Sequence, residues 1–130
     1  MHTVTLGSTN ITVNKNAFGA LPIQRVSDDY AVMLLKKAYD QGVRFFDTAR
    51  MYTDSEHKIH LAFSHMREKV FISSKTTATT VEDFWKDLEI SLGYLGYIDI
   101  YQFHNPSFCP KPGDGTGLYE AMLQAKEQGK

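Results

Sequence analysis

The sequence predicts an α/β fold: the N-terminal half of a (β/α)8 TIM barrel, with about four parallel strand–helix units and a β-hairpin in front of them. The first observation is that short apolar runs alternate with longer segments whose apolar residues recur every three or four positions. Such alternation is typical of strands and helices built around a parallel sheet. The second is that three of these runs end in Asp47, Lys75 and His104, which are 28 and 29 residues apart, close to the length of one strand–helix unit.

The hairpin is expected over residues 1–13. Apolar and polar residues alternate on both sides of a Gly-Ser-Thr-Asn segment at residues 7–10, which is typical of a turn between two strands. We expect the hairpin to act as a lid or plug and not as a chemical site. The strand–helix units occupy residues 17–130, so residues 1–130 are interpreted as one partial barrel domain.

The first unit begins with a short apolar run at residues 17–23, which contains Gly19 and is expected to form a strand. Apolar residues then recur at helical spacing over residues 28–41. Ser27 is placed to cap the start of this helix, and Gly42 is placed just after its end, where glycine is favoured.

Three further units follow the same pattern. Strands are expected at residues 43–47, 69–75 and 97–104, and a near capping box begins at Thr80. The three helices are predicted from the apolar residues that share one face: Ile59, Ala62, Phe63 and Met66; then Phe84, Trp85, Leu88, Leu92 and Leu95; then Leu118, Ala121, Met122 and Ala125.

Four units make half of a barrel, because an eight-unit barrel needs about 250 residues. The last predicted helix closes at residues 127–129 with Glu-Gln-Gly, much as the first closes at residues 40–42 with Asp-Gln-Gly before a strand. We therefore expect another strand after Lys130 and interpret the chain as a fragment of a longer enzyme. The first and fourth strands would be open sheet edges, which favour self-association.

Composition limits the classes of partner. The formal net charge of -1 provides no broad field to attract nucleic acid or an anionic membrane, so a small molecule is the expected partner. No segment approaches the roughly 20 apolar residues needed to cross a bilayer. Cys109 is the only cysteine and the N-terminus lacks a basic, apolar leader, so we expect a cytoplasmic protein.

The strand ends carry the chemistry. In a (β/α)8 barrel the reactive groups sit where strands run into the following loops, because the interior below is filled with side chains. Neighbouring strands lie about 4.8 Å apart, so Asp47, Lys75 and His104 can converge on one small volume. One charged strand end would be unremarkable as a solvated terminus, but three in phase are much harder to explain in that way.

Tyr52 is a candidate proton donor, because it lies five residues beyond Asp47 in the loop that would fold over this mouth. A free phenol has a pKa of about 10, and a nearby cation favours the phenolate, as general acid catalysis near neutral pH requires. Lys75, paired with Asp47, is suited to that role.

Three segments resemble the aldo-keto reductase family. Residues 45–56 read Phe-Phe-Asp-Thr-Ala-Arg-Met-Tyr-Thr-Asp-Ser-Glu and resemble its signature, while residues 72–76 and 99–106 resemble its lysine and histidine strands. The similarity covers nearly the whole chain, including the hairpin and the Phe-Gly turn at 18–19. Residues 23–25 and the signature also resemble relatives with a C-terminal iron–sulfur segment, although this chain shows no such segment.

The resemblance implies reversible hydride transfer between NADPH, less often NADH, and the carbonyl carbon of an aldehyde or ketone. Tyr52 would protonate the oxygen, Lys75 and Asp47 would tune Tyr52, and His104 would orient the carbonyl and help stabilise its charge. Gly19 and Asp47 would contact the cofactor near the nicotinamide ribose. No metal is required, and the remaining cofactor contacts in this family come mostly from later strands.

The sequence also admits other interpretations. The main alternative is a catalytically inactive half-barrel that folds or acts only by association with another chain. A metal site at His57, His60 and His65 is disfavoured because their spacing does not put all three on one helical face and no ligand completes a tetrahedron. Residues 110–117 lack a phosphate-loop pattern and are interpreted as a flexible rim loop near the substrate.

Overall fold

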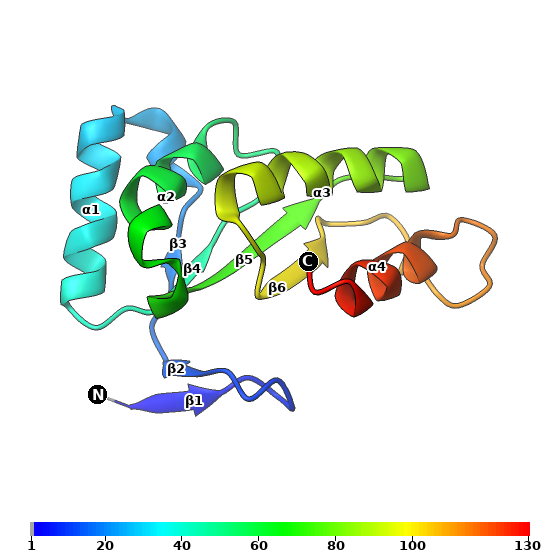
Figure 1. Ribbon diagram of the computed structural model, residues 1–130, viewed down its shortest axis with the longest axis horizontal. Helices are drawn as coiled ribbons and strands as arrows, with labels where there is room; N and C mark the ends of the chain where they lie inside the picture. Colours follow the sequence, from blue (N-terminus) through cyan, green and yellow to red (C-terminus); the bar gives the residue numbers. More distant parts are fainter. Residues whose placement is uncertain (1) are drawn as a thin grey trace.

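The computed structural model describes residues 2–130 and contains a four-stranded parallel sheet with helices packed along it (Figure 1). The sheet consists, in spatial order, of β3 (Phe18–Gly19), β4 (Phe45–Asp47), β5 (Phe71–Thr76) and β6 (Ile100–Phe103). The helices are α1 (Asp28–Asp40), α2 (Ser55–Phe63), α3 (Val81–Leu95) and α4 (Leu118–Glu127). Two short 3-10 helices, η1 (Pro22–Arg25) and η2 (Ser64–Lys69), complete the chain.

Each strand of the sheet is followed by a helix, so the predicted strand–helix unit recurs four times within residues 2–130. The register aligns Gly19 with Asp47, Asp47 with Ser73, and Lys75 with Gln102. Because all four strands are parallel and adjacent in sequence order, their carboxyl ends lie along one edge of the sheet. Groups at these ends are therefore brought close together.

The hairpin consists of β1 (Thr3–Thr5) and β2 (Thr12–Asn14), paired antiparallel with Val4 opposite Val13. The side-chain amide of Asn14 donates a hydrogen bond to the carbonyl of Gly42, just before β4 begins. The hairpin thus lies at the end of the sheet where strands begin (Figure 1). The hairpin extends one residue further than the predicted residues 1–13.

The core lies between the sheet and the helices. Two of these helices, α1 and α3, begin at the capping residues that the sequence predicts. The hydroxyl of Ser27 accepts a hydrogen bond from the backbone N–H of Tyr30, and Thr80 accepts one from Asp83. The largest fully buried apolar side chains of the cluster are Ile23, Leu35, Phe46, Ile59, Phe63, Ile72, Phe84, Leu88 and Leu118. Within the described residues, no helix is both long enough and apolar enough to span a membrane.

The first strand is shorter than predicted. The apolar run at residues 17–23 forms a strand only at Phe18–Gly19, and its end belongs to η1. Part of the reason is local, because Pro22 at the start of η1 has no N–H to donate to a strand ladder. The other part is tertiary: the buried Lys58 ammonium donates hydrogen bonds to the carbonyl oxygens of Ile23, at 3.0 Å, and Val26, at 2.8 Å. These carbonyls satisfy the lysine, and the chain turns away from the sheet.

The fourth strand is also shorter than the predicted 97–104. Arg67 donates a hydrogen bond to the carbonyl of Tyr97, at 2.6 Å. The Asp99 carboxylate accepts one from the backbone N–H of Ile72, at 2.8 Å. Side chains thus replace part of the strand pairing, and β6 starts at Ile100.

One helix also ends earlier than the apolar spacing suggests. The apolar spacing predicts Met66 on the helical face that begins at Ile59, but α2 ends at Phe63 and the chain continues as η2. Met66 has φ -145° and ψ 34°, outside the helical region, and still packs partly buried against the core. Apolar spacing located a core contact here without identifying the backbone conformation.

Candidate active site

The four predicted side chains come from three strand ends and one loop. Asp47 is the last residue of β4, Lys75 is the last but one of β5, and His104 directly follows β6. The backbone N–H of His104 donates to the carbonyl of Thr76 at 2.8 Å, which continues the strand ladder by one residue. Tyr52 lies in the loop between β4 and α2.

Lys75 is held by two acceptors from the neighbouring strand end. Its Nζ donates to Oδ2 of Asp47 at 2.7 Å and to the backbone carbonyl of Thr48, also at 2.7 Å. The hydroxyl of Ser73 donates to the other carboxylate oxygen, Oδ1 of Asp47. The carboxylate is therefore fixed through both oxygens. Sequence reasoning identified the ion pair but missed Ser73 and the carbonyl of Thr48.

Tyr52 folds over this pair. The Nζ of Lys75 lies 5.5 Å from the centroid of the Tyr52 ring. The ring meets His104 edge to face, with centroids 5.4 Å apart and an interplanar angle of 84°. The imidazole, phenol, ammonium and carboxylate thus gather at one edge of the sheet, as the strand-end argument predicts.

The loop that carries Tyr52 is tightly folded and anchored. Thr53 adopts a left-handed conformation, with φ 43°, and Arg50 donates to the carbonyl of Thr53 at 3.0 Å. Arg50 also forms a salt bridge with the fully buried Glu56. The other carboxylate oxygen of Glu56 accepts hydrogen bonds from Ser74 of β5, at 2.6 Å, and Ser91 of α3, at 2.7 Å.

The buried Glu56 carboxylate needs partners for its charge, because an unpaired buried charge is strongly destabilising. Its partners join the loop and α2 to β5 and α3. Sequence reasoning did not find the network. The available signal was the Ser-Glu pair at the end of the motif at residues 45–56.

Burial lowers the pKa of His104 below its ordinary value of 6.5, and the positive charge of Lys75 lowers it further. Asp47 acts in the opposite direction and does not offset these two effects. The Nδ1 atom of His104 is buried without a hydrogen-bond partner among residues 2–130. The imidazole is therefore neutral at pH 7, and Nε2 is the ring nitrogen left to interact with a bound molecule.

The space beside Asp47 is open toward β3. Gly19 is exposed and aligned with Asp47, and a Cβ atom built on it would meet no atom within 4 Å. The Asp47 side chain is 36% exposed. Each carboxylate oxygen can accept more than one hydrogen bond, so Asp47 can still receive a hydroxyl group. The strand ends at Gly19 and Asp47 thus combine open space with a hydrogen-bond acceptor.

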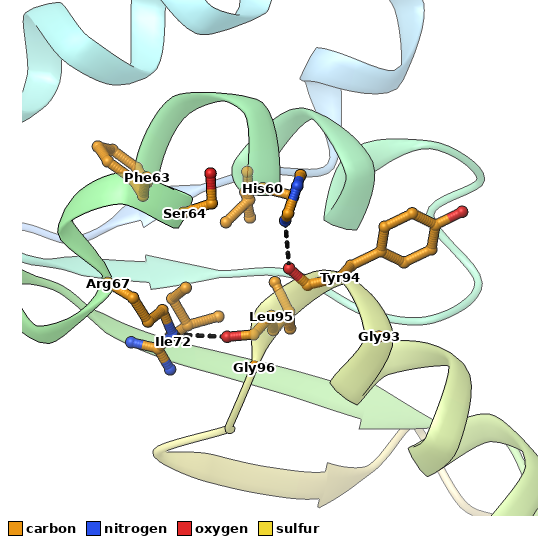
Figure 2. A pocket seen from close by; sticks show the side chains of 10 residues that line it. His60, Phe63, Ser64, Arg67, Ile72, Gly93, Tyr94, Leu95 and Gly96 are labelled. Atoms are coloured by element: carbon orange, nitrogen blue, oxygen red, sulfur yellow. Dashed lines mark hydrogen bonds between the residues drawn. The ribbon is translucent and has the colours of Figure 1, made fainter.

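Of the cavities among residues 2–130, one adjoins the loop after β6 and another lies between two helices. One of about 30 Å³ adjoins His104 and is bordered by Pro106, Phe108 and Pro110 of that loop. The other, of about 240 Å³, lies between α2 and the end of α3 (Figure 2). There His60 is hydrogen-bonded to the carbonyl of Tyr94 at 2.8 Å. None of the four candidate residues lines the larger cavity, so it is separate from the site.

With this geometry in view, the comparisons with known proteins assign the family. The model of the aldo/keto reductase family matches residues 5–130, and the chain belongs to this family. It is 35% identical over 126 residues to methylglyoxal reductase DkgB of Salmonella typhi, covering 87% of this chain and 44% of that protein. It is 29% identical over 116 residues to an aldo-keto reductase of Mycobacterium avium, covering 84% of this chain and 40% of that one. The chain thus spans less than half the length of these relatives.

Solved structures show the same fold. A thermostable aldo-keto reductase in complex with the inhibitor epalrestat superposes with a TM-score of 0.83 and 30% identity, covering 99% of this chain and 51% of that one. The holo form of an aldo-keto reductase from Bacillus halodurans gives a TM-score of 0.86 at 22% identity, covering 99% of this chain and 47% of that one. The predicted family and the predicted partial (β/α)8 barrel are confirmed.

Proposed function

We propose that the protein is an NADPH-dependent oxidoreductase that reduces aldehydes or ketones, and that this chain supplies its acid–base group. The observation that carries the proposal is the convergence of Asp47, Tyr52, Lys75 and His104 at one edge of the parallel sheet. The membership of the family and the reductase names of the relatives support the same reaction class.

Tyr52 is the proton donor in this proposal. A carbonyl that gains a hydride at carbon needs a proton at oxygen, and a phenol at hydrogen-bond distance supplies it as a general acid. The cation beside the ring stabilises the phenolate that remains. Lys75 uses two of its three N–H donors on Asp47 and Thr48, so one is left for the reaction.

His104 orients the substrate. Its lowered pKa keeps the imidazole neutral at pH 7, so the ring can donate one hydrogen bond without adding a full positive charge beside Lys75. A donor aimed at the carbonyl oxygen stabilises the charge that develops there during hydride transfer. The edge-to-face contact with Tyr52 keeps the imidazole and the phenol next to each other.

Asp47 and Gly19 are the proposed contacts for the nicotinamide ribose, because Asp47 is partly exposed and the space beside Gly19 is open. The nicotinamide, when bound, supplies the hydride, so the chain itself provides orientation, a proton and electrostatic stabilisation. We propose NADPH ahead of NADH, and we propose that the reaction requires no metal.

Methylglyoxal is the first substrate to test, since the relative named above that shares 35% identity with this chain is a methylglyoxal reductase. NADPH oxidation is measured with the entire protein that the gene encodes. Tyr52→Phe removes the acid and is expected to lower kcat/KM at least about 100-fold, within the usual range for a general acid. Tyr30→Phe, at an exposed tyrosine of α1, is the matched control and should retain the rate. Equal rates for Tyr52→Phe and the parent protein would contradict the proposal.

A second candidate is a catalytically inactive half-barrel that acts by pairing with a second copy of the chain. The supporting observation is that β6 has a neighbouring strand on one side only within residues 2–130. An apolar cavity of about 470 Å³ lies beside β6 and α4, lined in part by Ile98, Tyr101 and Met122. An unpaired strand edge next to an apolar surface favours association through that edge.

A further inference from the structure

Ser73 occupies a position that the proposed reaction has not yet used. It lies in β5, where the register places it opposite Asp47 on one side and Ile100 on the other. Its side chain is 1% exposed, and its hydroxyl donates to Oδ1 of Asp47. Serine is a weak strand former with little apolar surface to bury, so its contribution at this central position comes from the hydrogen bond of its hydroxyl.

The Asp47 carboxylate is held differently at its two oxygens. Lys75 contacts Oδ2, and Ser73 contacts Oδ1. The terminal torsion of an aspartate is broad, so a single contact with a flexible ammonium leaves the carboxylate plane free to rotate. A second contact from a rigid strand fixes that plane. Oδ2 then remains directed at Lys75.

The hydroxyl also moderates charge. A hydrogen bond to a carboxylate takes up part of its negative potential. Because Asp47 shares its charge between Ser73 and Lys75, the ammonium is less completely neutralised and retains more positive potential toward the Tyr52 ring, 5.5 Å away. Both effects act through Asp47, so Ser73 needs no contact with substrate.

We infer that Ser73 is a positioning residue of the site, whose buried hydroxyl fixes and partly neutralises Asp47 so that Lys75 faces Tyr52. The part of this inference that concerns catalysis rests on the proposed reductase function. The neighbouring serine provides the contrast: Ser74 is equally buried, but its hydroxyl donates to Glu56 on the helix side of the sheet.

The first test is independent of turnover. The imidazole of His104 is titrated by NMR in the chain, in Ser73→Ala and in Ser74→Ala. Loss of the Ser73 hydroxyl strengthens the negative potential of Asp47, so the pKa of His104 is expected to move upward toward its ordinary value. Ser74→Ala removes a hydroxyl of the same kind from the adjacent residue, and the pKa of His104 should stay where it is in the parent chain.

The second test uses the enzyme as its gene encodes it. Ser73→Ala is expected to lower kcat about fivefold with little change in KM, because an interaction that acts on the acid–base group affects the chemical step. Ser73→Thr keeps the hydroxyl and should restore kcat. A parent enzyme without reductase activity would reject the proposed function, and the titration would still decide the role of Ser73.

The inference is overturned if Ser73→Ala and Ser74→Ala give the same His104 titration. It is also overturned if an active enzyme keeps its full kcat in Ser73→Ala. Unfolded protein would also raise the His104 pKa, so the titration is read from the resonances of the folded form. A general loss of folded protein lowers the active fraction without shifting those resonances.

Discussion

Lys75 connects the other groups of the site, since its ammonium contacts Asp47 and a backbone carbonyl and lies beside the ring of Tyr52. Asp47 ends β4 and Tyr52 lies in the following loop, whereas Lys75 lies in β5, which is distant from both in sequence. The proposed chemistry therefore depends on a single cation placed between a carboxylate and a phenol. A long apolar side chain at this position would keep the volume and lose the charge.

Lys75→Met is expected to lower kcat/KM for methylglyoxal reduction at least about 100-fold, because the phenolate loses its stabilising cation. Lys36→Met, at an exposed lysine of α1, removes the same charge far from the strand ends and should keep the parental rate. The measurement is NADPH oxidation under steady-state conditions. A Lys75→Met enzyme as fast as the Lys36→Met control would show that the cation is dispensable.

His104 should couple stability to pH. Because its folded-state pKa lies below the unfolded value of 6.5, the unfolded chain binds a proton first as pH falls. The contribution of His104 to the free energy of unfolding is therefore favourable above pH 6.5, and it is lost as the pH falls from 6.5 through the lowered folded-state pKa. Urea unfolding of the parent chain and of His104→Gln, at pH 5 and pH 7, should show a smaller pH effect in the variant. An identical pH effect in both would contradict this assignment.

At the scale of elements, the loop between β4 and α2 is held by buried charge. Arg50 bridges the loop to Glu56, and Glu56 is fully buried with hydrogen bonds to Ser74 and Ser91. Removing the cation would leave a desolvated carboxylate with only neutral partners. Removing the carboxylate charge alone would keep an oxygen able to accept hydrogen bonds.

Arg50→Met is accordingly expected to destabilise the fold by about 3 kcal/mol, the usual cost of breaking a buried ion pair on one side. Glu56→Gln should cost less, because its amide oxygen can still accept from the serines. Chemical denaturation measures both, and Arg25→Met, at an exposed arginine of η1, is the control. Arg50→Met and Arg25→Met of equal stability would show that the salt bridge contributes nothing.

The elements show where sequence reasoning succeeds. Ser27 and Thr80 were placed correctly at the starts of α1 and α3, because a cap is a local interaction with a residue three positions ahead. Strand lengths were overestimated at residues 17–23 and 97–104. There the backbone is taken up by Lys58, Arg67 and Asp99, which apolar periodicity does not register.

For the whole molecule, the sheet has two edges, and β6 is the one beside an apolar cavity. We expect the isolated chain to self-associate through this edge, with two copies related by a twofold axis. Sedimentation over a range of concentrations should show a dimer. Leu123→Lys, on the α4 side of the cavity, should weaken it, while Leu61→Lys, at a similarly exposed leucine of α2, should not. A monomer at every concentration would contradict this expectation.

The sequence by itself determined the order of the strand–helix units, the helix starts and the strand ends that carry Asp47, Lys75 and His104. These features follow from short-range periodicity and capping, and parallel order then makes the strand ends adjacent. Only the tertiary structure decided that Ser73 contacts Asp47, that Glu56 is the partner of Arg50, and that burial keeps His104 neutral. Those outcomes depend on which side chains meet across strands and how much water they lose, and neither is encoded in local spacing.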